Sequence, residues 1–182
     1  GLYNPVILKR FSSVWQANEQ LVLLDEFYDK IEKKLNCQFN FRIPILRKFY
    51  SIEEQNNWFI ASDKKDLAPY LSTKLISKKI EGIDSPYDYG EVNYTGYVDV
   101  ALLIEKYKAY LLKNNQYLEE IFDYSLLLTR EDCIEYKNIK AKHIIFAEGF
   151  GMHSNPYFNH LPLDGTKGEL FVIKAPNLDL KV

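Results

Sequence analysis

Apolar residues recur at three- and four-residue steps in two stretches of the chain, with polar residues between them. In the first stretch, 14–35, the apolar positions are Leu21, Leu24, Tyr28, Ile31 and Leu35. In the second, 100–113, they are Val100, Leu103, Ile104, Tyr107 and Leu111. Such spacing predicts amphipathic helices with one buried face. Asp99 is a suitable N-cap for the second helix, and Asn114-Asn115 a suitable left-handed end.

Strict alternation of apolar and polar residues predicts a strand over "FNFRIPI" (39–45), continuing to residue 50. Pro44 lies on the polar side and predicts an edge strand or a bulge there, because proline donates no ladder hydrogen bond. A weaker alternation predicts a strand over 90–100. Apolar runs predict two later strands, at 143–149 and 168–176.

Shorter signals connect these elements. Ser51 followed by Glu54 is a capping-box pattern that predicts a short helix. Charged residues, glycine and proline between 73 and 89 predict an exposed loop. Together the helices and strands predict an α+β or α/β fold, with a mixed sheet and flanking helices.

The composition fits one soluble domain. The 182 residues are 47% hydrophobic and 26% charged, which indicates neither disorder nor a membrane span. The net charge of -2 gives no broad basic field for nucleic acid, and the basic cluster at 72–79 is interpreted as a solvated face. Cys37 and Cys133 match no metal or redox spacing, which fits a reducing, cytoplasmic location.

The start of the chain predicts that it is part of a longer protein. The only methionine is Met152, and the chain opens with the apolar "GLYNPVILKRF" and no signal peptide. Removal of an initiator methionine before Gly1 is the alternative explanation.

The stretch "HIIFAEGFGMHSNP" (143–156) has the spacing of a dinucleotide-binding turn in Gly149, Gly151 and Ser154. Glu169 follows Gly149 by twenty residues, where an acidic ribose ligand is expected. However, a phosphate-binding turn must lead into a helix, and Pro156 with the later prolines and glycines prevents one. The segment is therefore not the first phosphate-binding turn of a Rossmann unit.

Other chemical motifs are weaker still. His153 and His160 lie near each other but lack a third ligand, so no metal site is predicted. The sequence has no nucleophile elbow and no P-loop.

Four stretches in order resemble the D-amino-acid oxidase and glycine oxidase superfamily of FAD-dependent oxidoreductases. They are "GLYNPVILKRF", "GEVNYTGYVDVALLIEKYKAYL", "KHIIFAEGFG" and "LPLDGTKGELFVI". The resemblance covers most of the chain and matches the central part of such flavoproteins. Glu148, where the family usually has a small residue, and Lys167, where arginine is common, depart from the pattern.

The resemblance implies a substrate-side domain joined to an incomplete FAD-binding, Rossmann-like portion. Residues 36–100 would supply substrate-domain strands and loops, 101–160 part of the FAD-binding portion, and 161–182 a return strand. The cofactor-binding residues implied are Gly1, Leu2, Tyr3, Asn4, Ala147, Gly149 and Gly151. The main phosphate-binding motif would lie upstream, so the chain alone is expected to be inactive and without FAD.

By this resemblance, the parent enzyme oxidises the C–N bond of an amine or amino acid. Arg42 and Arg47 are candidate substrate-binding residues, because a guanidinium grips a carboxylate with two hydrogen bonds. No individual catalytic residue is predicted. The alternative is a non-catalytic binding domain, in which the fourteen tyrosines and eleven phenylalanines form an interaction surface.

Overall fold

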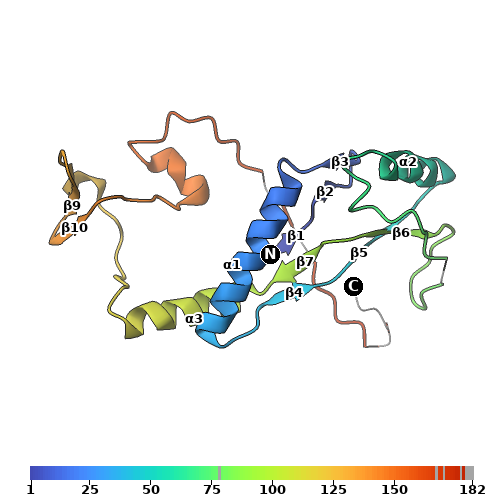
Figure 1. Ribbon diagram of the computed structural model, residues 1–182, viewed down its shortest axis with the longest axis horizontal. Helices are drawn as coiled ribbons and strands as arrows, with labels where there is room; N and C mark the ends of the chain where they lie inside the picture. The colour runs from blue at the N-terminus through green and yellow to red at the C-terminus, as the bar shows by residue number, and fades with distance from the viewer. Residues whose placement is uncertain (78, 167, 170, 177, 179–182) are drawn as a thin grey trace. The chain divides into compact units, whose positions relative to one another are not determined.

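The computed structural model describes residues 1–77, 79–166, 168–169, 171–176 and 178 (Figure 1). The chain divides into two compact units, one of Gly1–Tyr117 with Lys174–Val182 and the other of Leu118–Ile173. One boundary falls between Tyr117 and Leu118 and the other between Ile173 and Lys174. Each unit is described by itself below.

The first predicted helix is confirmed as α1, Ala17–Leu35, the longest element of the first unit. It lies between Gln16 and Asn36, which both adopt left-handed backbone conformations, with φ values of 49° and 48°. Near its end, the Glu32 carboxylate accepts hydrogen bonds from the backbone N–H groups of Phe39, at 2.8 Å, and Asn40, at 2.7 Å. This side chain therefore fixes the point at which the chain leaves the helix and enters the sheet.

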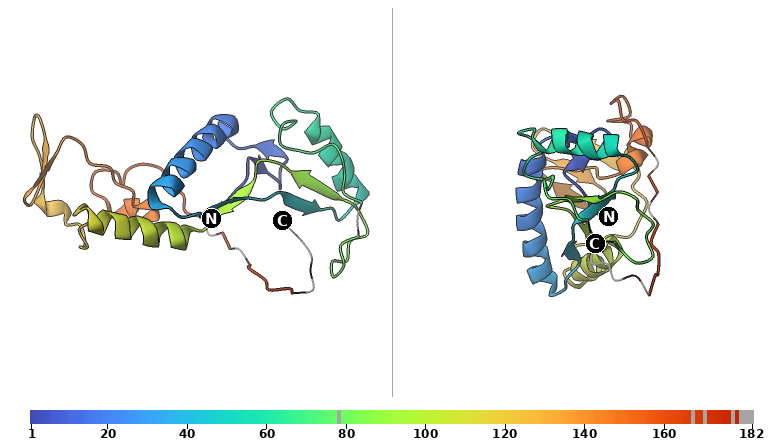
Figure 2. Two further views of the ribbon diagram at one scale, coloured as in Figure 1. Left: turned by 60° about the horizontal axis from the view of Figure 1, so that its bottom comes forward. Right: turned by 90° about the vertical axis from the view of Figure 1, so that its right-hand side faces the viewer.

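The sheet of the first unit is built on a long antiparallel ribbon. One side consists of β4, Asn40–Arg42, and β5, Ile45–Lys48; the other consists of β6, Tyr89–Val92, and β7, Gly96–Val98. Figure 2 shows these strands side by side as one twisted ribbon. The N-terminal strand β1, Leu2–Tyr3, adds to the free edge of β7, giving the order β1-β7-β4.

A β-bulge interrupts the ribbon at Pro44 and confirms the expectation of an edge or a bulge there. Arg42 pairs with Gly96 and Ile45 with Val92, so two residues on one strand face three on the other. The extra residue is accommodated by Tyr94, whose φ is 58°. The buried Thr95 closes the bulge, since its hydroxyl donates to the Ile43 carbonyl at 2.6 Å. The sequence predicted continuous strands where the bulge separates each into two.

The core of the first unit lies where the ribbon meets α2, Ile52–Ser62. The largest fully buried residues there are Phe49, Trp58, Leu67, Leu71 and Val92. The predicted helix and its Ser51 cap are confirmed, because the Ser51 side chain accepts the Glu54 backbone N–H at 3.0 Å. The Glu54 carboxylate accepts the Tyr50 N–H, so the reciprocal half of the capping box is shifted by one residue. A small hairpin of β2, Val6–Ile7, and β3, Ser12–Ser13, packs on this core through the ring of Phe11, 5.9 Å from that of Trp58.

The second predicted helix is confirmed as α3, Val100–Lys113. The Asp99 side chain caps it by accepting the Leu102 N–H at 3.0 Å, and Asn115 beyond its end has a φ of 53°. Its apolar stripe was expected to be buried, and this expectation is wrong. No residue of α3 is fully buried, and Ile104 is 60% exposed. The reason is that α3 packs along one side on α1, which leaves part of the stripe uncovered.

The second unit contains a three-stranded antiparallel sheet of β8, Leu127–Thr129, β9, Ile134–Tyr136, and β10, Ile139–Ala141. A short 3₁₀ helix, η1, Tyr124–Leu126, precedes the sheet, and a second, η2, Gly149–Ser154, follows it. Aromatic rings connect these parts: Phe122 stacks on Tyr136 at 4.4 Å, and Phe146 meets Phe122 edge-on at 5.7 Å. The sheet and these aromatic contacts hold the unit together.

The predicted strand at 143–149 is wrong, because residues 143–148 are irregular and Gly149 begins η2. The strand predicted at 168–176 is absent from its described residues, 168–169 and 171–176. Both runs are apolar, yet Ile145 is 88% and Val172 99% exposed. A strand exists only with a hydrogen-bonded neighbour, and neither run has one in the described structure.

The described fold is therefore α+β with small antiparallel sheets. Each strand pair within the described residues is antiparallel. A Rossmann-like portion needs parallel strands, and the described residues do not form one. The part of the expectation that holds is the mixture of helices and sheets.

Candidate functional site

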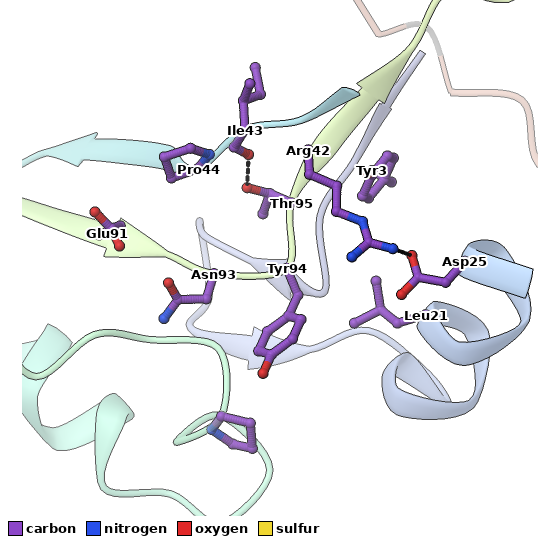
Figure 3. A pocket seen from close by; sticks show the side chains of 11 residues that line it. Tyr3, Leu21, Asp25, Arg42, Ile43, Pro44, Glu91, Asn93, Tyr94 and Thr95 are labelled. Carbon is purple, nitrogen blue, oxygen red and sulfur yellow. Dashed lines mark hydrogen bonds and ion pairs between the residues drawn. The ribbon is translucent and has the colours of Figure 1, made fainter. Parts of the chain in front are cut away.

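The bulge opens a pocket on the first unit, with a volume of about 530 Å³ (Figure 3). It lies between α1, the end of β1 and the bulged part of the ribbon. Its polar lining residues are Tyr3, Asp25, Arg42, Glu91, Asn93, Tyr94 and Thr95, and its apolar ones Leu21, Ile43, Pro44 and Pro69. A volume of this size is typical of small-molecule sites. We call it the bulge pocket.

An ion pair dominates the chemistry of the bulge pocket. Arg42 on β4 reaches Asp25 on α1, with 2.6 Å between the guanidinium nitrogen and the carboxylate oxygen. Both side chains stay accessible, at 62% and 43% exposure, so the pair adds at most about 1 kcal/mol to stability. The guanidinium carries five N–H groups, and this contact uses one of its nitrogens. Arg42 therefore retains donors for a ligand carboxylate.

The charges of the bulge pocket also favour a ligand with a positive group. One formal positive charge, on Arg42, faces two formal negative charges, on Asp25 and Glu91. A simple anion would be repelled by the two carboxylates, whereas a cation or a zwitterion would be attracted.

Tyr3 forms one wall of the bulge pocket and is held by the sheet. Its hydroxyl donates to the Asn40 side-chain carbonyl at 3.2 Å. Burial raises the pKa of the Tyr3 phenol above its usual value, an effect the Arg42 guanidinium opposes. The ring lies over Gly96, where an added Cβ would stand 2.2 Å from the Tyr3 hydroxyl oxygen. Only glycine lets the ring approach β7 this closely.

The four N-terminal residues predicted to contact a cofactor form the edge strand and its turn. Gly1 and Val98 exchange backbone hydrogen bonds of 2.6 and 2.8 Å, so the next pair, Leu2 and Tyr97, is a non-hydrogen-bonded pair. The N–H and C=O of Leu2 consequently point away from β7. Asn4 turns the chain, with its side-chain oxygen accepting the Val6 N–H at 2.9 Å.

Arg47 occupies a different place from Arg42. Its Nε donates to a Glu54 carboxylate oxygen at 3.0 Å and its Nη2 to the same oxygen at 2.5 Å. The other oxygen of Glu54 accepts the Tyr50 N–H at 3.0 Å, and the Glu54 side chain is only 6% exposed. Arg47 thus has a partner inside the fold and does not line the bulge pocket, while Arg42 does.

The remaining predicted cofactor-binding residues, Ala147, Gly149 and Gly151, belong to the second unit. Gly149 has a φ of 56°, and apart from the adjoining backbone no heavy atom lies within 4 Å of the position its Cβ would occupy. The backbone at Gly149 is therefore open to an approaching group. For Gly151, the nearest atom to such a Cβ is the Cβ of Glu148, at 3.5 Å.

Glu148 holds the glycine turn in place. Its carboxylate accepts a short hydrogen bond from the Tyr124 hydroxyl and another, of 2.7 Å, from the fully buried Asn155 side chain. The hydrogen bond to Glu148 raises the pKa of the Tyr124 phenol. Glu148 thus links η1 to the residue that follows η2, which a small side chain could not do.

Several of these residues carry no recognisable signal in the sequence. Asp25 was one of many acidic residues on the polar side of α1, and no sequence signal linked it to Arg42. Thr95 and Tyr94 gave no sign of the bulge, although Pro44 indicated where the opposite strand would be disturbed. Glu148 was noted only as a departure, and its partners lie 24 and 7 residues away.

Comparison with known proteins adds no family. No protein-family model matches the sequence, and no solved structure matches it significantly.

None of the helices in the described part of the chain has the length and apolar character needed to traverse a bilayer. The described residues also contain no cluster of three or more histidine, cysteine or acidic side chains arranged to hold a metal.

Proposed function

We propose that this chain is the central, substrate-binding region of an FAD-dependent oxidoreductase that oxidises the C–N bond of an amino acid. The observation that carries the proposal is the bulge pocket, in which one guanidinium and two carboxylates surround a cavity of small-molecule size. An amino acid zwitterion has the complementary charges, a carboxylate for Arg42 and an ammonium for Asp25 and Glu91. The motif resemblance supplies the reaction class.

Two backbone features fit a bound dinucleotide. The outward N–H and C=O of Leu2 offer one donor and one acceptor at the sheet edge. Gly149 offers bare backbone in a left-handed conformation, with open space where a side chain would be. In the proposed enzyme the Leu2 backbone would be a contact for FAD on the first unit, and the Gly149 backbone is by itself a candidate contact on the second. FAD, when bound, would accept the hydride from the carbon that bears the amine.

In this proposal the chain's own residues bind and orient the substrate. Arg42 would grip the carboxylate and fix the direction of the substrate, while Asp25 would hold the amino group nearby. Tyr3 would close one side of the pocket and help to exclude water. Its phenol is protonated at neutral pH, as tyrosine is with its ordinary pKa, and its hydroxyl donates to Asn40, which keeps the ring in place. We place the enzyme in the cytoplasm, where Cys37 and Cys133 stay as the free thiols that the structure shows.

The test uses the protein encoded by the whole reading frame beside this 182-residue chain. The whole protein should carry flavin, and adding an amino acid in the absence of oxygen should reduce the flavin and bleach its absorbance. This chain alone should be colourless. Arg42→Ala should raise KM for the amino acid at least about tenfold, because a charge-assisted hydrogen bond is lost. Lys33→Ala removes one exposed positive charge from α1, outside the bulge pocket, and should leave KM unchanged. A whole protein without flavin, or equal kinetics for Arg42→Ala and the native enzyme, would refute the proposal.

A second candidate function rests on an uncovered apolar surface. A groove of about 380 Å³ runs between α1 and α3, and Phe27 and Ile104 in it are 57% and 60% exposed. Large exposed apolar residues mark protein contacts. The alternative is therefore a non-catalytic interaction domain, and a flavin-free whole protein that forms stable complexes through this groove would support it.

A further inference from the structure

A second cavity of the first unit has the opposite charge from the bulge pocket. It lies between the turn of the β2–β3 hairpin and α2, and its volume is about 750 Å³. Its charged lining residues are Lys9, Arg10, Arg47, Lys64, Glu53 and Glu54. We call it the basic pocket.

Ion pairing leaves the basic pocket with a net positive charge. Arg47 and Glu54 neutralise each other through their hydrogen bonds. Lys9, Arg10 and Lys64 then face a single carboxylate, that of Glu53, and within the described residues none of these three cations forms an ion pair or hydrogen bond through its side chain. Two positive charges are thus in excess, in a chain whose net charge is -2. A dianion is the ligand whose charge matches.

The backbone of the turn that carries Lys9 and Arg10 is held in place by packing. Phe11, directly after Arg10, has a φ of 45° and directs its ring into the core against Trp58, which is fully buried. On the other side of the hairpin, the Ser13 hydroxyl donates to Asp66 at 2.8 Å, which ties β3 to the segment after α2. The tip with Lys9 and Arg10 is therefore fixed beside α2, as Figure 1 shows for the hairpin and the helix.

The basic pocket also has an uncovered apolar wall. Tyr50 is 73% and Ile60 63% exposed, and both line the cavity beside the cations. An exposed tyrosine ring favours stacking with a flat group. A ligand with a charged end and a flat apolar end would satisfy both parts of the lining.

We infer that the basic pocket binds a small ligand in which a phosphate dianion is joined to a flat apolar group. Phosphate fits better than a single carboxylate, because it carries two charges and three acceptor oxygens for three cationic side chains. A nucleic acid fits less well, because a polynucleotide needs a continuous track of cations and the net charge of the chain is negative. This site shares no lining residue with the bulge pocket and does not rest on the proposed function.

Calorimetric titration of the 182-residue chain with phenyl phosphate at pH 7.5 tests the inference. Phenyl phosphate should bind most tightly and inorganic phosphate more weakly. Phenol should show no saturable binding. Lys9→Gln, Arg10→Gln and Lys64→Gln should each weaken binding of phenyl phosphate about two- to fivefold, as the loss of one solvated charge contact predicts. Raising the salt concentration should weaken it as well.

Lys33→Gln is the matched control, because it removes one exposed positive charge from α1, outside the basic pocket. It should leave the affinity for phenyl phosphate unchanged. Equal losses for Lys33→Gln and Lys9→Gln, or equal binding of phenol and phenyl phosphate, would overturn the inference. Tighter binding of a ten-nucleotide RNA than of phenyl phosphate, weakened by the same three substitutions, would overturn it in favour of a nucleic-acid surface. The titration needs neither flavin nor turnover, so its result is separate from that of the enzyme assay.

Discussion

The Arg47–Glu54 pair should act mainly on stability, and Glu54→Ala tests this directly. The substitution removes the acceptor for two N–H groups of Arg47 and for the backbone N–H of Tyr50. Breaking a fully buried ion pair costs about 3–5 kcal/mol. Because the Arg47 side chain is 33% exposed and water can reach it, the lower end applies. We expect Glu54→Ala to reduce the free energy of unfolding of the first unit by about 3 kcal/mol.

Urea unfolding followed by tryptophan fluorescence measures this loss. Trp58 is fully buried in the same unit, and Trp15, which is 76% exposed, is first replaced by phenylalanine in all variants. Glu54→Gln keeps an acceptor for Tyr50 and should cost about half as much. Lys48→Ala, on the exposed side of β5, is the control and should change the free energy of unfolding by less than about 0.5 kcal/mol.

Substitutions in this pair distinguish a structural role of Arg47 from a role in substrate binding. A double-mutant cycle of Arg47→Ala and Glu54→Ala should give a coupling energy of about 2 kcal/mol, since each residue satisfies the other. A loss below about 1 kcal/mol for Glu54→Ala would refute this reasoning. If Arg47→Ala then raised KM of the whole enzyme tenfold or more with little change in stability, the sequence-based role of Arg47 in substrate binding would hold instead.

Two further predictions concern local conformation and pH. Gly96→Ala should lower the free energy of unfolding by about 3 kcal/mol or more, because its Cβ would collide with the Phe41 backbone carbonyl as well as with the Tyr3 ring. Gly149→Ala should cost only about 1 kcal/mol, because the alanine would have to adopt a left-handed backbone. Urea unfolding measures both losses. The hydrogen bond to Lys140 lowers the pKa of Glu135 below 4.5, and the same contact raises that of Lys140 above 10.5. The stabilisation from this pair should therefore be lost as the pH falls through the lowered pKa of Glu135, and also as the pH rises through the raised pKa of Lys140. A carboxyl NMR titration midpoint at or above 4.5 for Glu135 would contradict this.

Local interactions explain which parts of the fold the sequence predicted. The caps at Ser51 and Asp99 join residues three positions apart, so the residue types alone identify them. The stripe of α1 likewise repeats within single turns of helix. These signals located the helices within a few residues of their observed ends.

The remaining features depend on residues that are far apart in the sequence. Thr95 closes the bulge by a hydrogen bond to Ile43, 52 residues away. Arg42 on β4 pairs with Asp25 on α1, and the spacing of apolar residues in the sequence does not predict contacts between different elements. The apolar run at 143–149 has strand character, yet a strand forms only where another strand can pair with it. The resemblance supplied the reaction class but gave no indication of the carboxylates that surround Arg42.

Because of the bulge, the candidate binding site depends on the number of residues between β6 and β7 as well as on the side chains that line it. Three residues, Asn93 to Thr95, span the distance that Ile43 and Pro44 cover on the neighbouring strand. Deleting one of the three would let the strands pair without interruption and flatten the hollow in which a ligand would lie, even with every charged group retained. In related chains, a single-residue deletion at this point would therefore be a stronger sign of lost binding than replacement of any one side chain in the lining.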